Sequence, residues 1–100
     1  MSAGARDAVF GALADETRRI LLDRLRMKNG QSLVQLGKGL GISRQAITKH
    51  LVVLEEAGLV QTEKQGREKL HYLNPVPIQA IAVRWLQDFG KVPLGSLIGR

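Results

Sequence analysis

The most informative part of the chain is residues 40–60, which read LGISRQAITKHLVVLEEAGLV. Ser43 is a residue type that caps the start of helices, and Gly58 is one that ends them. Apolar side chains recur between the two at the i, i+4 and i+7 spacing of a helix face. These are Ile47, Leu51 and Leu54. The pattern predicts an amphipathic helix that begins after Ser43.

A second helical segment precedes this one. Ser32 is a capping residue, and the leucines that follow it lie on one helical face. Gly37 and Gly39 each cost about 1 kcal/mol relative to alanine inside a helix, so this segment either packs closely on a neighbour or is irregular. Little more than Gly41 and Ile42 joins the two segments. Such a short link with a glycine at the turn is typical of a helix-turn-helix.

The chain after the second helix favours a β-hairpin. Residues 59–64 and 68–73 read as two strands around the turn at 65–67. The tip is polar and basic, and it suits either contact with DNA phosphates or entry into a minor groove, although solubility alone explains it equally well. The residues concerned are Lys64, Gln65, Gly66, Arg67 and Lys69.

Further helices are predicted at both ends. Residues 4–13 form a short first helix that carries Val9 and Phe10, and a longer helix follows from Glu16. The last helix covers 76–89, where prolines are tolerated in the first turn. Its apolar stripe packs either within one chain or against a second copy of the chain. We favour packing against a second copy, because the stripe includes large aromatic side chains. The stripe consists of Ile78, Ile81, Ala82, Trp85 and Phe89.

The elements together predict a mainly α fold with a two-stranded antiparallel β-wing, a winged helix-turn-helix. Residues 32–57 form the helix-turn-helix and 59–73 the wing. We expect one domain over 1–100, because the chain has no repeat or Pro- or Ser-rich linker and is long enough for one modest core. No role is assigned to residues 92–100.

The composition narrows the function. Fifteen basic against nine acidic residues leave a formal charge of +6, which attracts polyanions such as nucleic acid. The absence of cysteine excludes disulfide scaffolds, iron–sulfur centres and thiolate metal sensors. No apolar run approaches the roughly 18 residues of a membrane helix, and the first residues lack the apolar segment of a signal peptide. We therefore expect a cytoplasmic protein that has no membrane partner.

The outer face of the helix after Ser43 has the residue types that read DNA. At 100° per residue, the side chains of Gln45, Thr48 and Lys49 point outward, and Arg44 lies on the flank. Gln bonds adenine edges, Arg and Lys bond guanine, and Thr contacts a thymine methyl or a phosphate. The helix starts at Ser32 and Ser43 suit phosphate clamping. The alternative is an ordinary solvated face, and the neighbouring basic hairpin argues against it.

The sequence does not favour an enzyme or a metal site. Asp15 and Glu16 fit helix caps, and the other acidic residues of the N-terminal third fit a solvated face. His50 lies beside the inward stripe of the reading helix, where packing or a phosphate-side role suits it better than metal ligation. His71 faces either the outside or a neighbouring element. No spacing of a metal site, phosphate loop or nucleophile is present, so we expect no cofactor.

Two segments resemble a known family. Residues 9–21, VFGALADETRRIL, and residues 40–60 are similar to the opening and the helix-turn-helix of the ArsR/SmtB family of bacterial winged-helix repressors. Gly66 and Arg67 at the wing and Tyr72 at its close extend the resemblance, which covers about 9–73.

The resemblance implies a homodimeric regulator, mostly a repressor, with the first and last helices at the dimer interface. It implies that Arg44, Gln45, Thr48 and Lys49 occupy base-reading positions. The family's cysteine ligands in the third helix and its Asp and His ligands in the last helix are absent here. Metal-driven release is therefore not expected, whereas a small-molecule effector of unknown identity stays open.

Two functions remain as hypotheses. The first is a sequence-specific dimeric DNA-binding repressor whose operator is an inverted repeat with half-site centres about 34 Å or a multiple apart. The second is a winged-helix module that binds an acidic protein partner with its basic face. Duplex DNA added to the purified protein discriminates them.

Overall fold

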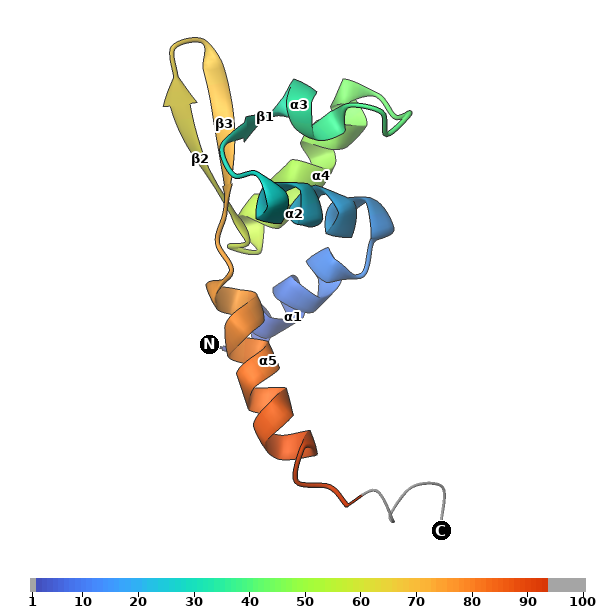
Figure 1. Cartoon of the computed structure of the whole chain (residues 1–100), viewed down its shortest axis with the longest axis vertical. Helices are drawn as coiled ribbons and strands as arrows, with labels where there is room; N and C mark the ends of the chain where they lie inside the picture. The colour runs from blue at the N-terminus through green and yellow to red at the C-terminus, as the bar shows by residue number, and fades with distance from the viewer. Residues whose placement is uncertain (1, 94–100) are drawn as a thin grey trace.

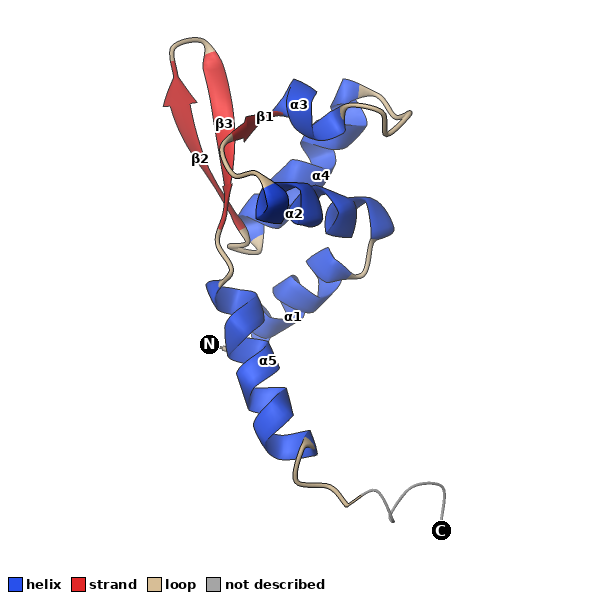
Figure 2. Cartoon of the chain, viewed as in Figure 1, coloured by secondary structure: helices blue, strands red, loops and turns tan. Residues whose placement is uncertain are grey.

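The computed structural model describes residues 2–93. Within these residues the chain forms five helices and three strands, shown in chain order in Figure 1 and by type in Figure 2. They are α1 (Ala3–Leu13), α2 (Glu16–Met27), β1 (Gln31–Ser32), α3 (Leu33–Gly37), α4 (Arg44–Glu56), β2 (Val60–Gln65), β3 (Glu68–Leu73) and α5 (Val76–Phe89). The expected fold class, a winged helix-turn-helix, is confirmed. Of the segment 92–100, residues 94–100 lie outside the described part.

One aliphatic core holds the helices and the base of the hairpin together. The buried residues come from α1 to α4, from the start of β2 and from the residue before it. They are Val9, Ala12, Leu21, Leu22, Leu25, Leu36, Ile47, Leu51, Leu54, Leu59 and Val60. Because α2 and α3 both pack on α4, the inner side of α4 is fixed in the middle of the molecule.

Of the two alternatives for the glycines of this segment, close packing on a neighbour holds at Gly37 but not at Gly39, and α3 is shorter than the sequence indicated. A Cβ atom at Gly37 would lie 3.0 Å from Cγ1 of Ile47, so a side chain there would push α3 away from α4. The helix ends at Gly37 rather than near position 40. Gly39 lies beyond it with a φ of 78°, a left-handed conformation that glycine adopts without steric cost.

The hairpin belongs to a sheet of three strands, one more than the sequence predicted. β2 and β3 pair antiparallel with Gln65 opposite Glu68, which leaves Gly66 and Arg67 at the tip. β1 pairs with the other edge of β3, where Gln31 lies opposite His71, so the strand order is β1-β3-β2. A strand of two residues has no alternating pattern, and its partner lies far along the chain. β1 ties the hairpin to the start of α3.

His71 lies inside the molecule. The expectation that it faces either the outside or a neighbouring element is resolved in favour of the neighbour, because the residue is only 3% exposed. Its Nδ1 lies 2.9 Å from the carbonyl oxygen of Gln31 on β1. The imidazole therefore supports the pairing of β1 with β3.

The terminal helices α1 and α5 contact each other and lie on the side of the molecule away from the wing tip (Figure 1). Ile78 and Ile81 at the start of α5 pack on the core, but no residue of α5 is buried. Val9 is 1% exposed and belongs to the core of its own chain, so it has almost no surface to offer a second copy. The prediction that Val9 belongs to the dimer surface is therefore wrong, because its side chain is buried. Over the described residues, no helix has the length and apolar character needed to cross a membrane.

Candidate nucleic-acid interface

The polar side of α4 is exposed where the sequence placed it. Arg44, Gln45, Thr48 and Lys49 are all exposed, and they lie in the first two turns of the helix. The opposite side is almost sealed, with Ile47 and Leu51 at 2% and Leu54 at 0% exposed. The hydroxyl of Thr48 donates to the carbonyl oxygen of Arg44 at 2.9 Å, which leaves its methyl group available to a partner. The four side chains form one outward surface, called the reading face below.

Serines start the two helices of the helix-turn-helix. Oγ of Ser43 accepts a hydrogen bond from the backbone N–H of Ala46 at 3.1 Å. Ser32 and Gln35 cap α3 reciprocally: Oγ of Ser32 accepts from the Gln35 N–H, and Oε1 of Gln35 accepts from the Ser32 N–H. Both hydroxyls are therefore used in capping. Ser43 is exposed beside the reading face, whereas Ser32 is half-buried.

The predicted basic residues of the wing are exposed, but they do not form one uniform tip. Lys64 lies directly opposite Lys69 in the register of β2 and β3, and Arg67 is at the turn. Like charges at paired positions repel each other, and Glu68 lies between Arg67 and Lys69. Nζ of Lys69 lies 3.5 Å from Oε1 of Glu55, which links the wing to α4. Lys64, Gln65, Gly66 and Arg67 remain as the outermost part.

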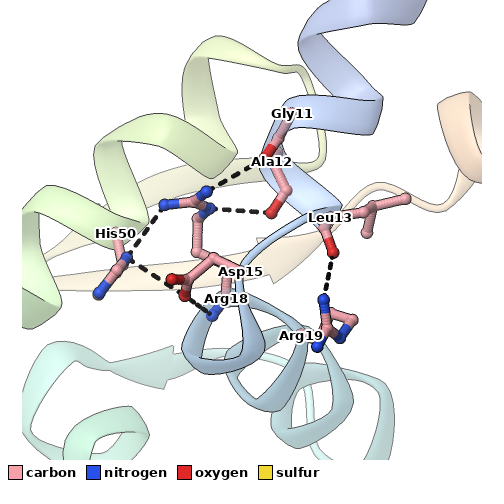
Figure 3. Close-up of polar contacts among 7 residues, drawn as sticks. All are labelled: Gly11, Ala12, Leu13, Asp15, Arg18, Arg19 and His50. Carbon is pink, nitrogen blue, oxygen red and sulfur yellow. Dashed lines mark hydrogen bonds and ion pairs between the residues drawn. The ribbon is translucent and has the colours of Figure 1, made fainter.

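An arginine that sequence reasoning missed fastens α4 to the corner between α1 and α2 (Figure 3). Nε of Arg18 donates to the carbonyl oxygen of Ala12 at 2.8 Å, and Nη2 donates to that of Gly11 at 3.1 Å. Its Nη1 lies 3.3 Å from Nδ1 of His50, which is the residue after Lys49 on α4. One guanidinium thus holds the end of α1 and the back of the reading helix. No local sequence pattern signals a contact across 32 residues.

Asp15 completes this cluster and caps α2, as the sequence indicated. Its Oδ2 accepts a hydrogen bond from the backbone N–H of Arg18 at 3.0 Å and lies 3.8 Å from Nδ1 of His50. That backbone hydrogen bond lowers the pKa of Asp15 below its ordinary value; the charges of His50 and Arg18 add to the effect, and desolvation opposes it. His50 therefore makes polar contacts with two residues at the start of α2. The described residues contain no group of three or more side chains that could hold a metal ion.

The far end of the molecule carries exposed aromatic side chains. Phe10 of α1 and Trp85 of α5 meet edge to face with ring centroids 6.2 Å apart, and Trp85 stacks on Phe89 at 4.8 Å. These three side chains are 42%, 48% and 59% exposed, and Leu86 beside them is 73% exposed. Ala82 is exposed next to them. Together the five residues form the aromatic face.

Comparison with known proteins places the chain in a family. A model described as a helix-turn-helix domain matches residues 13–63. The chain is 40% identical over 90 residues to the uncharacterized HTH-type transcriptional regulator YuzN of Bacillus subtilis, covering 84% of this chain and 98% of that one. A crystal structure of an ArsR family transcriptional regulator superposes with a TM-score of 0.80 at 30% identity, covering 91% and 92% of the two chains. This protein belongs to the ArsR family.

A second relative has a named role. The chain is 30% identical over 82 residues to the transcriptional repressor SdpR of Bacillus subtilis, covering 81% of this chain and 88% of SdpR. The ArsR family assignment makes this protein a transcriptional regulator with a helix-turn-helix DNA-binding fold. Transcriptional regulators of this family are not a class of enzymes.

Proposed function

We propose that this ArsR family member is a sequence-specific, dimeric DNA-binding repressor. The observation that carries the proposal is the two-sidedness of α4. Its inner side chains are anchored in the core, so its outer ones, Arg44 to Lys49, are presented at a fixed angle without holding the fold together. A polar helix face held in this way fits the major groove, which admits an α-helix. The similarity to SdpR supports repression rather than activation.

Affinity and specificity fall to different residues. Gln45 and Lys49 supply hydrogen-bonding groups suited to base edges, whereas Arg67 at the wing tip supplies a charge suited to phosphate. Base contacts discriminate sequences, and phosphate contacts strengthen the binding of every sequence. We therefore expect substitutions on α4 and on the wing to have different signatures.

The dimer is built from the aromatic face. A second copy that covers Phe10, Trp85 and Phe89 around a two-fold axis removes exposed aromatic surface from water. A two-fold protein binds an inverted repeat, with half-site centres about 34 Å or a multiple of that apart. The operator is therefore an inverted repeat of double-stranded DNA.

A gel-shift series over salt concentration tests the division of labour. We expect Gln45→Ala and Lys49→Ala each to lose about 5- to 150-fold in affinity for the operator and much less for unrelated DNA. Arg67→Ala weakens all duplexes alike and lowers the slope of the salt dependence by about one. Lys28→Ala, an exposed lysine at the far end of α2, is the matched control and leaves both unchanged.

Equal losses for every variant on every sequence would contradict this assignment of roles. The alternative hypothesis, a winged-helix module that binds an acidic protein partner, is favoured if no promoter fragment is shifted even at low salt. The fragments tested include the region upstream of the protein's own gene. Footprinting of that upstream region identifies the operator.

A further inference from the structure

A cavity of about 530 Å³ lies between α3, α4 and β3. Its apolar walls come from Leu33 and Val34 of α3 and from Leu51 and Val52 of α4. Val34 and Val52 are 56% and 41% exposed, so the walls are open to solvent on one side. The volume is in the range of sites that bind small molecules.

A buried polar side chain lines this cavity. His71 is 97% buried, since its exposed fraction is 3%, and it is the one buried polar residue among residues 2–93. Its Nδ1 faces the carbonyl oxygen of Gln31, which accepts hydrogen bonds only, so Nδ1 carries the proton. In the neutral ring the lone pair is then on Nε2, which is left as a hydrogen-bond acceptor for a molecule in the cavity.

The charge of the cavity is opposite to that of the chain. Glu55 and Glu68 line it together with one cation, Lys69, and Lys69 already pairs with Glu55 at 3.5 Å. Two carboxylates and one ammonium group leave a charge of −1 in a chain of +6. An acceptor nitrogen and an excess carboxylate select a molecule that donates hydrogen bonds and carries positive charge.

We propose that this cavity binds a small amphipathic amine, with its apolar part between α3 and α4 and its ammonium group toward Glu55 and His71. Thr48 and Lys69 also line the cavity. Thr48 belongs to the reading face, and Lys69 follows the wing tip on β3, so an amine seated here competes with DNA, and this consequence rests on the proposed function. The cavity is then the site of an effector that releases the operator.

Three probes of nearly equal size test the site directly: phenethylamine, phenethyl alcohol and hydrocinnamate. Each is titrated into isotopically labelled protein while the NMR signals of His71 and the methyl groups of Leu51 and Val52 are followed. We expect saturable shifts with phenethylamine, affinity about three- to fivefold lower for the alcohol, as a half-exposed ion pair contributes, and no saturation with the carboxylate. No saturable shift with the amine, or equal affinity for amine and carboxylate, overturns the proposal.

Two variants on neighbouring positions of α4 assign the selectivity. Glu55→Gln keeps the shape of the side chain and removes its charge, so the amine loses its advantage over the alcohol. Glu56→Gln is the matched control, because Glu56 is exposed and outside the cavity, and the preference for the amine persists. Val52→Trp fills the cavity from an exposed position and abolishes binding of both probes. If the preference for the amine persists in Glu55→Gln, Glu55 is not the partner of the ammonium group, and the proposed amine site is wrong.

Gel shifts with and without phenethylamine test the competition. At saturating amine we expect at least about fivefold weaker operator binding, compared at equal ionic strength with sodium chloride, and no such change in Val52→Trp. Saturable amine binding with unchanged operator affinity contradicts the effector role. Failure to bind any DNA without amine instead contradicts the proposed function, and the NMR titration judges the cavity independently of it.

Discussion

The helices α4 and α5 are of similar length and both expose a distinctive face, but they are held in different ways. α4 buries Ile47, Leu51 and Leu54 against its own chain, and its exposed side is polar. α5 buries no residue, and its exposed side carries Trp85 and Phe89. Polar side chains are well solvated by water. Covering a large exposed apolar face with a partner, in contrast, lowers the free energy. α4 is therefore packed on one side by its own chain, whereas α5 leaves an apolar face exposed.

The difference has a mechanical consequence. A helix anchored by its own core keeps its direction when the outer residues change, and Arg18 adds a second anchor behind His50. Only the start of α5 packs on the core, and beyond Ile81 the contact of Trp85 with Phe10 joins the helix to α1. The four predictions that follow test this contrast, beginning with the largest effect.

Shortening a buried side chain of α4 has the largest expected effect. Leu54→Ala removes a completely buried side chain and leaves a cavity, so we expect the free energy of unfolding to fall by about 2–5 kcal/mol. Urea denaturation followed by circular dichroism measures it. Met27→Ala, at a residue of α2 that is 75% exposed, is the control and changes stability by less than about 0.5 kcal/mol. A loss below about 1 kcal/mol for Leu54→Ala would show that α4 is not anchored as described.

Removing the central aromatic residue of α5 affects association more than folding. Trp85 contacts both Phe10 and Phe89, so Trp85→Ala dismantles the aromatic face and weakens the proposed dimer at least about 30-fold. Sedimentation equilibrium over a range of protein concentrations measures the dissociation constant. Gln79→Ala, at an exposed residue of α5 outside the aromatic face, leaves it unchanged. A wild-type chain that is monomeric at high concentration would remove the basis of this prediction.

Loss of the cap at the start of α4 has a smaller effect. Ser43→Ala leaves the N–H of Ala46 without its acceptor and costs about 1 kcal/mol, whereas Ser43→Thr retains most of the stability. The first residue before α5, Pro75, makes no side-chain cap, so there is no equivalent contribution to remove there. Urea denaturation gives the free energies, and amide exchange at positions 44–46 reports local fraying. Unchanged exchange in Ser43→Ala would mean that the cap does not hold the first turn.

The smallest expected effect is on the loss of stability at acidic pH. The pKa of Asp15 is lowered in the folded chain, so the unfolded chain binds the proton more readily and stability rises with pH. The contribution is complete above the unfolded pKa of about 3.9 and disappears as the pH falls through the folded value. We expect Asp15→Asn to lose less stability than wild type between pH 5 and pH 2.5, a range set about that pKa. Asp23→Asn, at an exposed carboxyl of α2, is the control; an identical acid dependence in Asp15→Asn and wild type would contradict the cap.

Much of the fold follows from short-range signals. The start of α4 is predicted by a capping serine and by apolar spacing, because both depend on residues within one or two turns. The hairpin is predicted to within one residue, since turn residues such as Gly66 mark its tip. Gly66 has a φ of 62°, which the tight turn requires.

The features that sequence reasoning missed depend on long-range contacts. β1 is a strand only because β3 lies beside it, and two residues carry no pattern of their own. The role of Arg18 is to bridge α1, α2 and α4, which neighbours in the sequence do not reveal. Val9 shows the same limit, since an apolar residue on a terminal helix serves the core or a partner according to which way the helix faces. The base-reading roles of Gln45 and Lys49 stay predictions.

The separation of the two sides of α4 has a consequence for how such a protein diversifies. Substitutions at positions 45 and 49 alter neither the core nor the polar contacts of the part of the chain that the structure describes. Under the proposed function, duplicated genes are free to accumulate changes at these positions and to acquire new target promoters while inheriting an unaltered scaffold. The same freedom makes the positions natural choices for a randomised library in search of orthogonal regulators.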